Sequence, residues 1–441
     1  MSSKAVRREE ASRHATSEVL GFGTLLALGI NGIVGVGIFF TPSQIAMLLP
    51  GRSGALAYLL TALALMPVAG VYAVLGGRFR QDGGPYVWAR AAFGPTAAFF
   101  VGWTAYVSAI FATATVVLAL SRYLAPVLGL TGPATERAFG WLSVGVLGAI
   151  VAAGLRPSSW VWTALTVAKL LPLALLVGLF IVRSAPVPPM PGPGTFHTAN
   201  LGRAMLIAVF ALQGFEIVPV PSGNARAASR AVPRATLASL LLAAGLYVVL
   251  QLACAAAVPD LAASDAPLVA AAAAYGGDIA GGVLGAGTGI SALGIAFGML
   301  AMTPRYLSVL GRPDALGVWL GLESERRVPL RALCVTLAAV CLLISFEALG
   351  ALFILSGLAV LVQYGVSALA LAKLSLARQC GLVRRDAWPA PLALVAILLV
   401  GHAATLAELR IMVAVLVSGA ACYGLRLQVR QRFGDRASRA R

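Results

Sequence analysis

The sequence is poor in charged side chains, and above all in acidic ones. Only 11% of the 441 residues are charged, 16 of them Asp or Glu, and 59% are hydrophobic; soluble domains carry roughly 25% charged and roughly 45–50% apolar residues. One membrane span takes about 20 apolar residues, so the chain has room for roughly a dozen spans and short loops. No separate soluble domain fits. The composition predicts an all-α integral membrane protein.

Residues that usually carry enzyme or metal chemistry are also scarce. The three histidines, at positions 14, 197 and 402, lack metal-ligand spacing, and the five cysteines are scattered, which predicts free thiols. No nucleophile–base pair, phosphate loop or Walker signature is present. A membrane enzyme would need buried catalytic groups in several helices, and only Glu216 and Lys169 qualify. We therefore expect no enzyme activity, no metal and no cofactor.

Basic residues are numerous but dispersed. Lys and Arg number 33 and give a formal charge of +17, yet they stand at the ends of apolar runs instead of forming one stripe, which argues against nucleic-acid binding. With a cytoplasmic N-terminus, alternate loops place 26 of them inside and six outside, and Lys169 lies within a span. This is the bias of the positive-inside rule. It predicts an even span count, both termini cytoplasmic, and a multi-pass protein of the inner (plasma) membrane.

Apolar runs between Gly, Pro and charged residues predict twelve retained helices and no cleaved signal peptide. They cover residues 20–47, 54–77, 95–124, 138–155, 159–182, 201–222, 236–258, 279–303, 331–346, 349–373, 388–406 and 409–427. The expected organisation is a cytoplasmic tail (1–19), a first five-helix repeat (20–182), a Pro-rich outer linker (183–200), a second five-helix repeat (201–373), two further helices (374–428) and a basic cytoplasmic tail (429–441).

Two runs are interrupted at corresponding places in the two halves. The sixth run, 201–222, contains Gly, Pro and Glu, and the first has glycines at positions 29, 32, 35 and 37. Paired broken helices are typical of an inverted-repeat transporter with its site at the midplane. Membrane glycines also serve close helix packing, but these four crowd one turn more than packing requires. An unwound turn would leave the amides of Gly35, Val36 and Gly37 at a half-helix N-terminus, which suits a carboxylate.

Ordered motifs extend this pattern along the chain, and they are Gly35-Val-Gly-Ile-Phe39, Asp82-Gly-Gly-Pro-Tyr-Val-Trp88 followed by Gly94-Pro95 and Gly102-Trp103, Phe210-Ala-Leu-Gln-Gly-Phe-Glu216 through Val232-Pro-Arg-Ala235, Ala266-Pro-Leu268, and Thr303-Pro-Arg-Tyr306 to Asp314. In this order they resemble helix 1, the first cytoplasmic loop, broken helix 6, the outer loop and the end of helix 8 of the amino acid–polyamine–organocation (APC) superfamily of permeases. The resemblance covers roughly residues 15 to 375.

The resemblance implies the leucine-transporter type of fold, with about 12 transmembrane helices in a 5+5 inverted repeat, helices 1 and 6 broken, and two C-terminal helices. It implies that the amides of Gly35, Val36 and Gly37 take the substrate carboxylate. The substrate ammonium would meet carbonyls near Ile30, Ile33 and Phe210.

This sequence departs from the family pattern at three positions. Val36 stands where the family usually has Ser or a small residue, so a hydroxyl contact is lost. Asn31 stands where the family usually has Gly, and it either selects substrate or caps the break. Asn224 stands where a Glu is common, which puts the family's inner-gate ion pair in doubt.

Glu216 and Lys169 are the two ionisable residues placed inside spans. Glu216 is either a structural carboxyl bound to amides of the helix 6 break or a group for gating and proton coupling, because burial disfavours the charged form of an acid. Lys169 either snorkels to a boundary or, as in sodium-independent members that this chain resembles, fills the place of a sodium ion and holds helix 1 against helix 8 through backbone carbonyls and Ser291. The second interpretation predicts sodium-independent transport.

Several aromatic residues are candidates for the pocket. By resemblance, Phe215 after Gly214 would shut the outer side of the pocket, and ordinary packing is the alternative. Trp103, Tyr106 and Tyr364 either line the pocket or anchor the membrane interface.

These patterns favour a secondary active permease for amino acids that uses a gradient instead of ATP, by symport or exchange. An antiporter for amines, polyamines or cationic amino acids is an alternative, and so is a non-transporting sensor on the same scaffold. Neutral substrates need only apolar walls, which this sequence supplies more readily than acidic ones. The expected partners are a small-molecule substrate and the lipid bilayer, and a homodimer stays open.

Overall fold

The computed structural model describes residues 20–154, 159–183, 198–310, 328–346 and 349–439, together with Leu322, Ser324 and Arg326. The predicted N-terminal tail, residues 184–197 of the Pro-rich linker, Asp314 and the last two residues lie outside this part. The described residues are helical apart from loops and one isolated bridge between Leu20 and Ala225. The all-helical class is confirmed.

The helices follow in the order α2 (Phe22–Ile33), α3 (Val36–Ala46), α4 (Ser53–Arg78), α5 (Pro85–Phe93), α6 (Pro95–Val127), α7 (Pro133–Ala152), α8 (Ser159–Arg183), α9 (Thr198–Leu212), α10 (Ala228–Ala257), α11 (Pro267–Leu310), α13 (Leu330–Phe346), α14 (Leu349–Leu376), α15 (Pro389–Gly401) and α16 (Leu406–Arg439), with short 3-10 turns at Phe215–Ile217, Ser222–Asn224, Leu261–Ala263 and Arg384–Ala387. Eight of the described helices are long and apolar enough to cross a membrane, or nine spans if the bent pair α2 and α3 counts as one. Every predicted run overlaps a helix, but twelve crossings and the inverted repeat stay predictions.

The sixth run is less helical than predicted. Helix α9 ends at Leu212, and the rest of the run forms turns with a 3-10 segment at Phe215–Ile217. Gly214 has φ +123°, which a right-handed helix cannot contain. Pro219 and Pro221 then lack the amide that a helix would need. The interruption expected in the sixth run thus begins directly after Leu212.

Two further helical features were not predicted. The short helix α5 precedes α6, and each of them starts on a proline, where a missing amide costs nothing. Helix α11 begins at Pro267 and is kinked at Gly277, where φ is +71°. The first ten residues of α11 thus form a separate helical segment in front of the predicted run 279–303.

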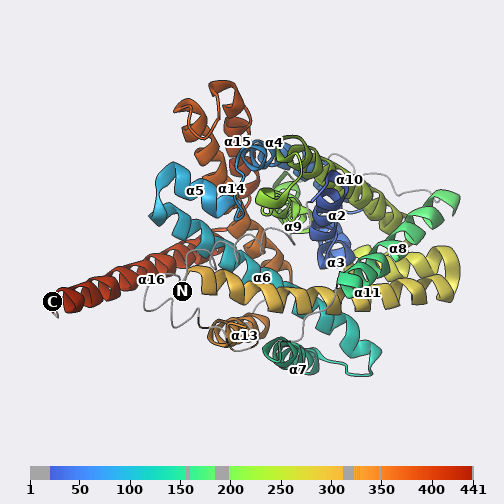
Figure 1. The fold of residues 1–441 in the computed structure, drawn as a ribbon. Helices are drawn as coiled ribbons and strands as arrows, with labels where there is room; N and C mark the ends of the chain where they lie inside the picture. Colours follow the sequence, from blue (N-terminus) through green and yellow to red (C-terminus); the bar gives the residue numbers. More distant parts are fainter. Residues whose placement is uncertain are drawn as a thin grey trace.

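The two halves of broken helix 1 lie inside the bundle (Figure 1). Helix α2 packs against α10, while α3 packs against α9 and α11. Around them, α4 contacts α10, α8 contacts α11, and the long helix α6 packs on both α11 and α14. Helix α16 touches α6 and extends beyond the bundle to the C-terminus. This arrangement surrounds the helix 1 break with α8, α9, α10 and α11.

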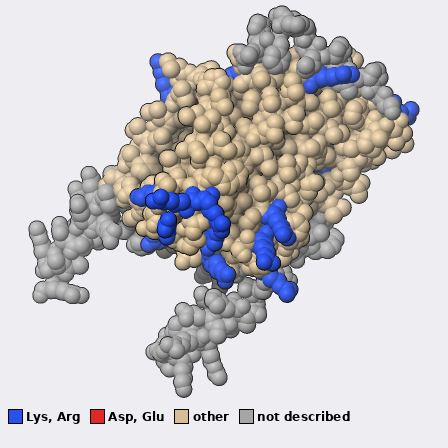
Figure 2. Space-filling view, turned by 90° about the horizontal axis from the view of Figure 1, so that it is seen from above, with Lys and Arg blue, Asp and Glu red and all other residues tan. Residues whose placement is uncertain are grey.

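The surface is that of a membrane protein. In the face shown in Figure 2, Lys and Arg side chains gather toward opposite ends, a wide region without charge lies between them, and no acidic side chain is in view. Large apolar side chains are exposed, as in Leu398 at 72% and Leu406 at 67%. Such a belt suits lipid contact, since exposed apolar surface of this extent is rare in soluble proteins. The chain is a multi-pass membrane protein.

Candidate functional site

The helix 1 break is a short bend between α2 and α3. The two helices meet at 43°, and only Val34 and Gly35 separate them. Gly35 is extended, with φ −124°, and begins α3 without a side-chain cap. The first-turn amides of α3, which include Val36 and Gly37, have no acceptor within the helix and carry the positive end of its dipole. This end of α3 can therefore receive a carboxylate.

The break leaves carbonyls in the last turn of α2, such as those of Asn31 and Ile33, without their helical amides, whereas Ile30 keeps its own. Val34 donates its amide to the Ile30 carbonyl at 2.8 Å. The hydroxyl of Tyr247, a buried residue of α10, donates to the Ile33 carbonyl at 2.8 Å. The Gly35 amide interacts with the same hydroxyl. A substrate ammonium would therefore share the Ile30 and Ile33 carbonyls with protein donors.

Lys169 satisfies a further carbonyl in the last turn of α2. Its Nζ donates to the Asn31 carbonyl at 2.9 Å, and the residue is 4% exposed. On the same helix, Thr166 Oγ1 donates to Asn31 Oδ1 at 3.2 Å. Both ends of Asn31 are thus held by α8. The lysine head lies inside the bundle instead of reaching toward a membrane boundary.

Ser291 lies on the face of α11 that joins α8 to the break. A Cβ on Gly287 would lie 2.4 Å from Pro172 Cγ and 3.2 Å from the Ala168 carbonyl of α8, and Ile295 is the closest side chain to Gly35. Ser291 is four residues from each of these positions, so it shares their helix face. Its hydroxyl is buried without a hydrogen-bond partner among the described residues. A polar atom is therefore available on the face of α11 that meets α8 and the break.

Three of the four glycines around the helix 1 break serve close packing. A Cβ would lie 2.6 Å from Ser239 Cβ at Gly29, 2.9 Å from the Gly214 carbonyl at Gly32, and 2.9 Å from Ala211 Cα at Gly37. Only Gly35 of the four has room for a Cβ, with 3.8 Å to the nearest atom. The expectation that their crowding exceeds the needs of packing was wrong, because three of the four are required by close neighbours.

The helix 6 break touches the helix 1 break directly. A Cβ on Gly214 would lie 2.4 Å from the carbonyl carbon and oxygen of Gly32 and 2.6 Å from the amide nitrogen of Ile33. Backbone therefore meets backbone where the two broken helices cross. The positive φ of Gly214 and this contact both require glycine.

Glu216 folds back onto the helix 6 break. Its Oε2 accepts the Gly214 amide at 2.7 Å and the Tyr364 hydroxyl of α14 at 2.9 Å. No described basic residue forms an ion pair with it. The carboxyl group thus ties the turn at Gly214 to α14, as a structural carboxyl would. Protonation of Glu216 would weaken these hydrogen bonds and so loosen the turn.

An aromatic cluster covers this carboxyl group. The fully buried ring of Phe215 lies 5.9 Å from the ring of Tyr72 and 5.5 Å from that of Tyr364. The Tyr72 hydroxyl accepts hydrogen bonds from Gln363 and Ser367. Phe210, on α9, packs its ring 4.7 Å from that of Phe353. Val36 is 2% exposed as well, whereas Gly35 and Glu216 are partly exposed, so the two breaks are only partly buried.

Other candidates contact different neighbours. Trp103 donates its indole N–H to the Val415 carbonyl of α16 at 2.8 Å. The Tyr106 hydroxyl lies 3.1 Å from Thr336 Oγ1 of α13. The side chain of Asn224 lies outside the described residues. Trp103 and Tyr106 therefore join α6 to α16 and α13.

Sequence reasoning missed Tyr247, Thr166 and Gln213. Tyr247 is a single phenol within a long apolar run, and that isolation was the available signal. Thr166 precedes Lys169 by three residues and shares its helix face. Gln213 donates to Ser356 Oγ at 3.3 Å, and its Oε1 is buried without a partner among the described residues.

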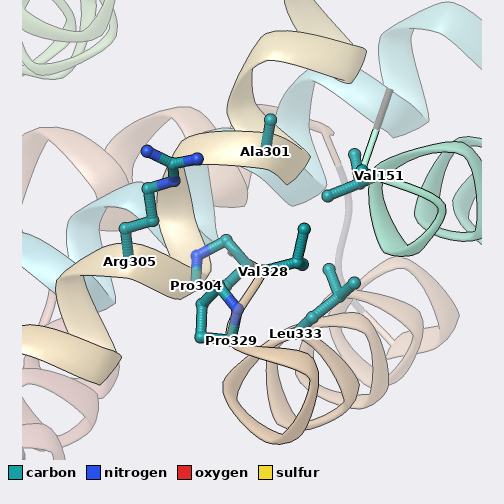
Figure 3. A pocket seen from close by; sticks show the side chains of 8 residues that line it. Val151, Ala301, Pro304, Arg305, Val328, Pro329 and Leu333 are labelled. Carbon is teal, nitrogen blue, oxygen red and sulfur yellow. The ribbon is translucent and has the colours of Figure 1, made fainter. Parts of the chain in front are cut away.

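Two surface cavities lie apart from the breaks. One, of about 200 Å³, is lined at α6, α7 and α13 by Leu118, Arg122, Pro133, Glu136, Arg137, Ile344 and Phe346. The other lies between α7, α11 and α13 (Figure 3).

Comparison with known proteins gives a consistent result. The family model described as amino acid permease matches residues 20–417. An uncharacterised transporter of Mycobacterium tuberculosis is 29% identical over 84% of this chain and 83% of its own length. The branched-chain amino acid permease of Lactococcus lactis is 28% identical (81% and 80%), and an arginine/ornithine antiporter of Pseudomonas aeruginosa is 25% identical (73% and 69%). The chain therefore belongs to the amino acid permease family of the APC superfamily, whose members are transporters and not enzymes.

Proposed function

We propose that this protein carries amino acids across the inner membrane without sodium, by proton symport or exchange, through alternating access around broken helices 1 and 6. Both termini would face the cytoplasm, and the twelve predicted helices would form two inverted repeats of five plus two more. The names of the relatives support amino acids as the substrate class. The observation that carries the sodium part is the contact of Lys169 with the helix 1 break.

The lysine ammonium supplies a fixed positive charge at a carbonyl that the break has orphaned. Backbone carbonyls left free by unwound membrane helices are typical cation ligands in transporters. Here a protein cation already occupies the Asn31 carbonyl, and the unpartnered Ser291 hydroxyl lies on the α11 face that packs on α8. A second cation at the same carbonyl would meet a like charge. In this proposal the lysine ammonium, and not sodium, would hold α2 against α11.

The substrate would bind where the two breaks cross. Its carboxylate would meet the amides at Gly35, Val36 and Gly37, and its ammonium the carbonyls of Ile30, Ile33 and Phe210. Gly214 and Phe215 would form the helix 6 side. Because the Glu216 carboxyl is engaged by Gly214 and Tyr364, it offers little to a cationic side chain. We therefore favour neutral amino acids over arginine, polyamines or agmatine.

Uptake into proteoliposomes tests the sodium part and the transport part together. We expect labelled amino acid to exchange with unlabelled amino acid inside the vesicles at the same rate in sodium and in choline buffer. A strict sodium requirement would contradict the role of Lys169. Binding of amino acids, seen as a rise in thermal stability, without any counterflow would identify a sensor instead.

Glu216→Gln tests proton coupling. The amide keeps an acceptor oxygen for the Gly214 amide and Tyr364 but cannot titrate, so we expect uptake that no longer changes with external pH. Tyr364→Phe is the matched control, since it removes one hydrogen bond to Glu216 and keeps the carboxyl. It should retain the pH dependence. A folded Glu216→Gln protein with the wild-type pH profile would show that the carboxyl is structural.

A further inference from the structure

The cavity between α7, α11 and α13 is a narrow slot with apolar walls. Figure 3 shows the side chains of Val151, Val328 and Leu333 turned toward one another, with Ala301, Pro304 and Pro329 completing the wall. Its free space is about 30 Å³. The slot therefore admits one or two methylene-sized groups and not a whole solute. Arg305 is the one charged residue that lines it.

Two arginines lie on or beside this slot. Arg305 is exposed and lies at its edge on α11, and no described residue forms an ion pair with it. Arg326 packs its side chain against Gly154, which also lines the slot, and donates one N–H to the Ala153 carbonyl at 3.1 Å. A guanidinium has five N–H donors, so Arg326 can bind an anion as well.

Large apolar side chains near the slot are exposed. Met302 and Tyr306, which flank Arg305 on α11, are 56% and 45% exposed, and Leu330 at the start of α13 is 38% exposed. Helix α7 ends, α11 ends and α13 begins at this place. The slot thus lies at an end of the membrane-spanning bundle, with apolar surface continuing from it along the helices.

We propose that this slot binds one anionic phospholipid, with the phosphate on Arg305 and Arg326 and the start of an acyl chain between Val151, Val328 and Leu333. Arginine clusters recognise phosphate through paired hydrogen bonds, and basic pockets between membrane helices are suited to anionic headgroups. The apolar walls add contacts for an acyl chain that a free anion cannot make.

The bound lipid would join the ends of three helices that already pack on one another through Val151, Leu300, Val328 and Leu333. Helix α11 continues from the slot to the α8 contact at Gly287 and to the neighbourhood of the helix 1 break at Ile295. A lipid that fixes the end of α11 would therefore stabilise the helix that lines the candidate substrate site. This goes beyond the proposed function, and the test does not depend on which solute is carried.

The test measures lipid binding to the purified protein by native mass spectrometry and thermal stability. We expect phosphatidylglycerol to bind and to raise the midpoint of unfolding, while phosphatidylcholine and inorganic phosphate do neither. The double variant Arg305→Gln/Arg326→Gln should lose about tenfold or more in phosphatidylglycerol affinity, because two charge-assisted contacts are removed.

Arg230→Gln/Arg234→Gln is the matched control. Both residues are exposed on α10, away from the slot, and their substitution removes the same amount of charge as in the first double variant. The control variant should therefore bind phosphatidylglycerol like the wild type. Equal losses in both double variants would overturn the proposal in favour of a diffuse charge effect. Wild-type binding by the Arg305/Arg326 variant, or equal stabilisation by phosphatidylcholine or by phosphate alone, would also overturn it.

Discussion

Gly214→Ala is expected to abolish transport and to leave little correctly assembled protein. Alanine at φ +123° is strained, which costs about 1–3 kcal/mol. Its Cβ would also lie 2.4 Å from backbone atoms of Gly32 and 2.6 Å from the Ile33 nitrogen. Overpacking costs about 1–3 kcal/mol when side chains can move, but here the opposing atoms are main chain. The crossing of the two broken helices must open for the variant to fold.

The measurement is the monodisperse yield after purification, followed by uptake. Gly365→Ala on α14 is a suitable control, because no atom lies within 4 Å of the Cβ it would add, and it should behave as the wild type. Gly32→Ala should resemble Gly214→Ala, since it meets the Gly214 carbonyl at 2.9 Å from the other side. A Gly214→Ala protein with normal yield and uptake would show that the breaks do not cross as described.

Much of the helical pattern could be predicted from apolar runs, because a membrane span is long and charged residues clearly mark its ends. The interruption of the sixth run could also be predicted, because Gly214 can adopt a positive φ and two prolines that lack amides follow it. The exact end of α9 at Leu212 could not. Helix α5 was not predicted from the sequence. It is short and lies between two glycines with positive φ, so its segment has the composition of a loop.

The candidate site was predictable as a set of residues but not as a set of contacts. Closely spaced glycines indicated the helix 1 break. The sequence alone could not distinguish Gly35, the N-cap residue of α3, from the three glycines that pack closely against Ser239, Gly214 and Ala211. Those partners come from α9, α10 and the helix 6 break, far along the chain. Tyr247 was missed in the same way, since only the fold brings its hydroxyl to the Ile33 carbonyl.

Lys169→Met is the most direct test of the lysine proposed to replace sodium. Methionine keeps the length and apolar stem of lysine but removes the donor to the Asn31 carbonyl, which α2 itself cannot satisfy at its last turn. An unpaired buried acceptor costs about 1–3 kcal/mol, and the membrane interior supplies no water to replace the lost partner. This cost would fall on the transport-competent arrangement of the helix 1 break. Since about 1.4 kcal/mol corresponds to a tenfold change, we expect initial uptake to fall by roughly fivefold to a hundredfold in a folded protein.

Thr166→Val separates this effect from a general loosening of α8. It removes the neighbouring hydrogen bond to Asn31 Oδ1, which is longer at 3.2 Å and does not involve the main chain. We expect uptake to fall much less than in Lys169→Met, with similar thermal stability in the two variants. Equal loss in both would assign the effect to the Asn31 side chain, whereas unchanged uptake in Lys169→Met would remove the ammonium from the mechanism. The difference between the variants thus measures what the charge at the helix 1 break contributes beyond packing.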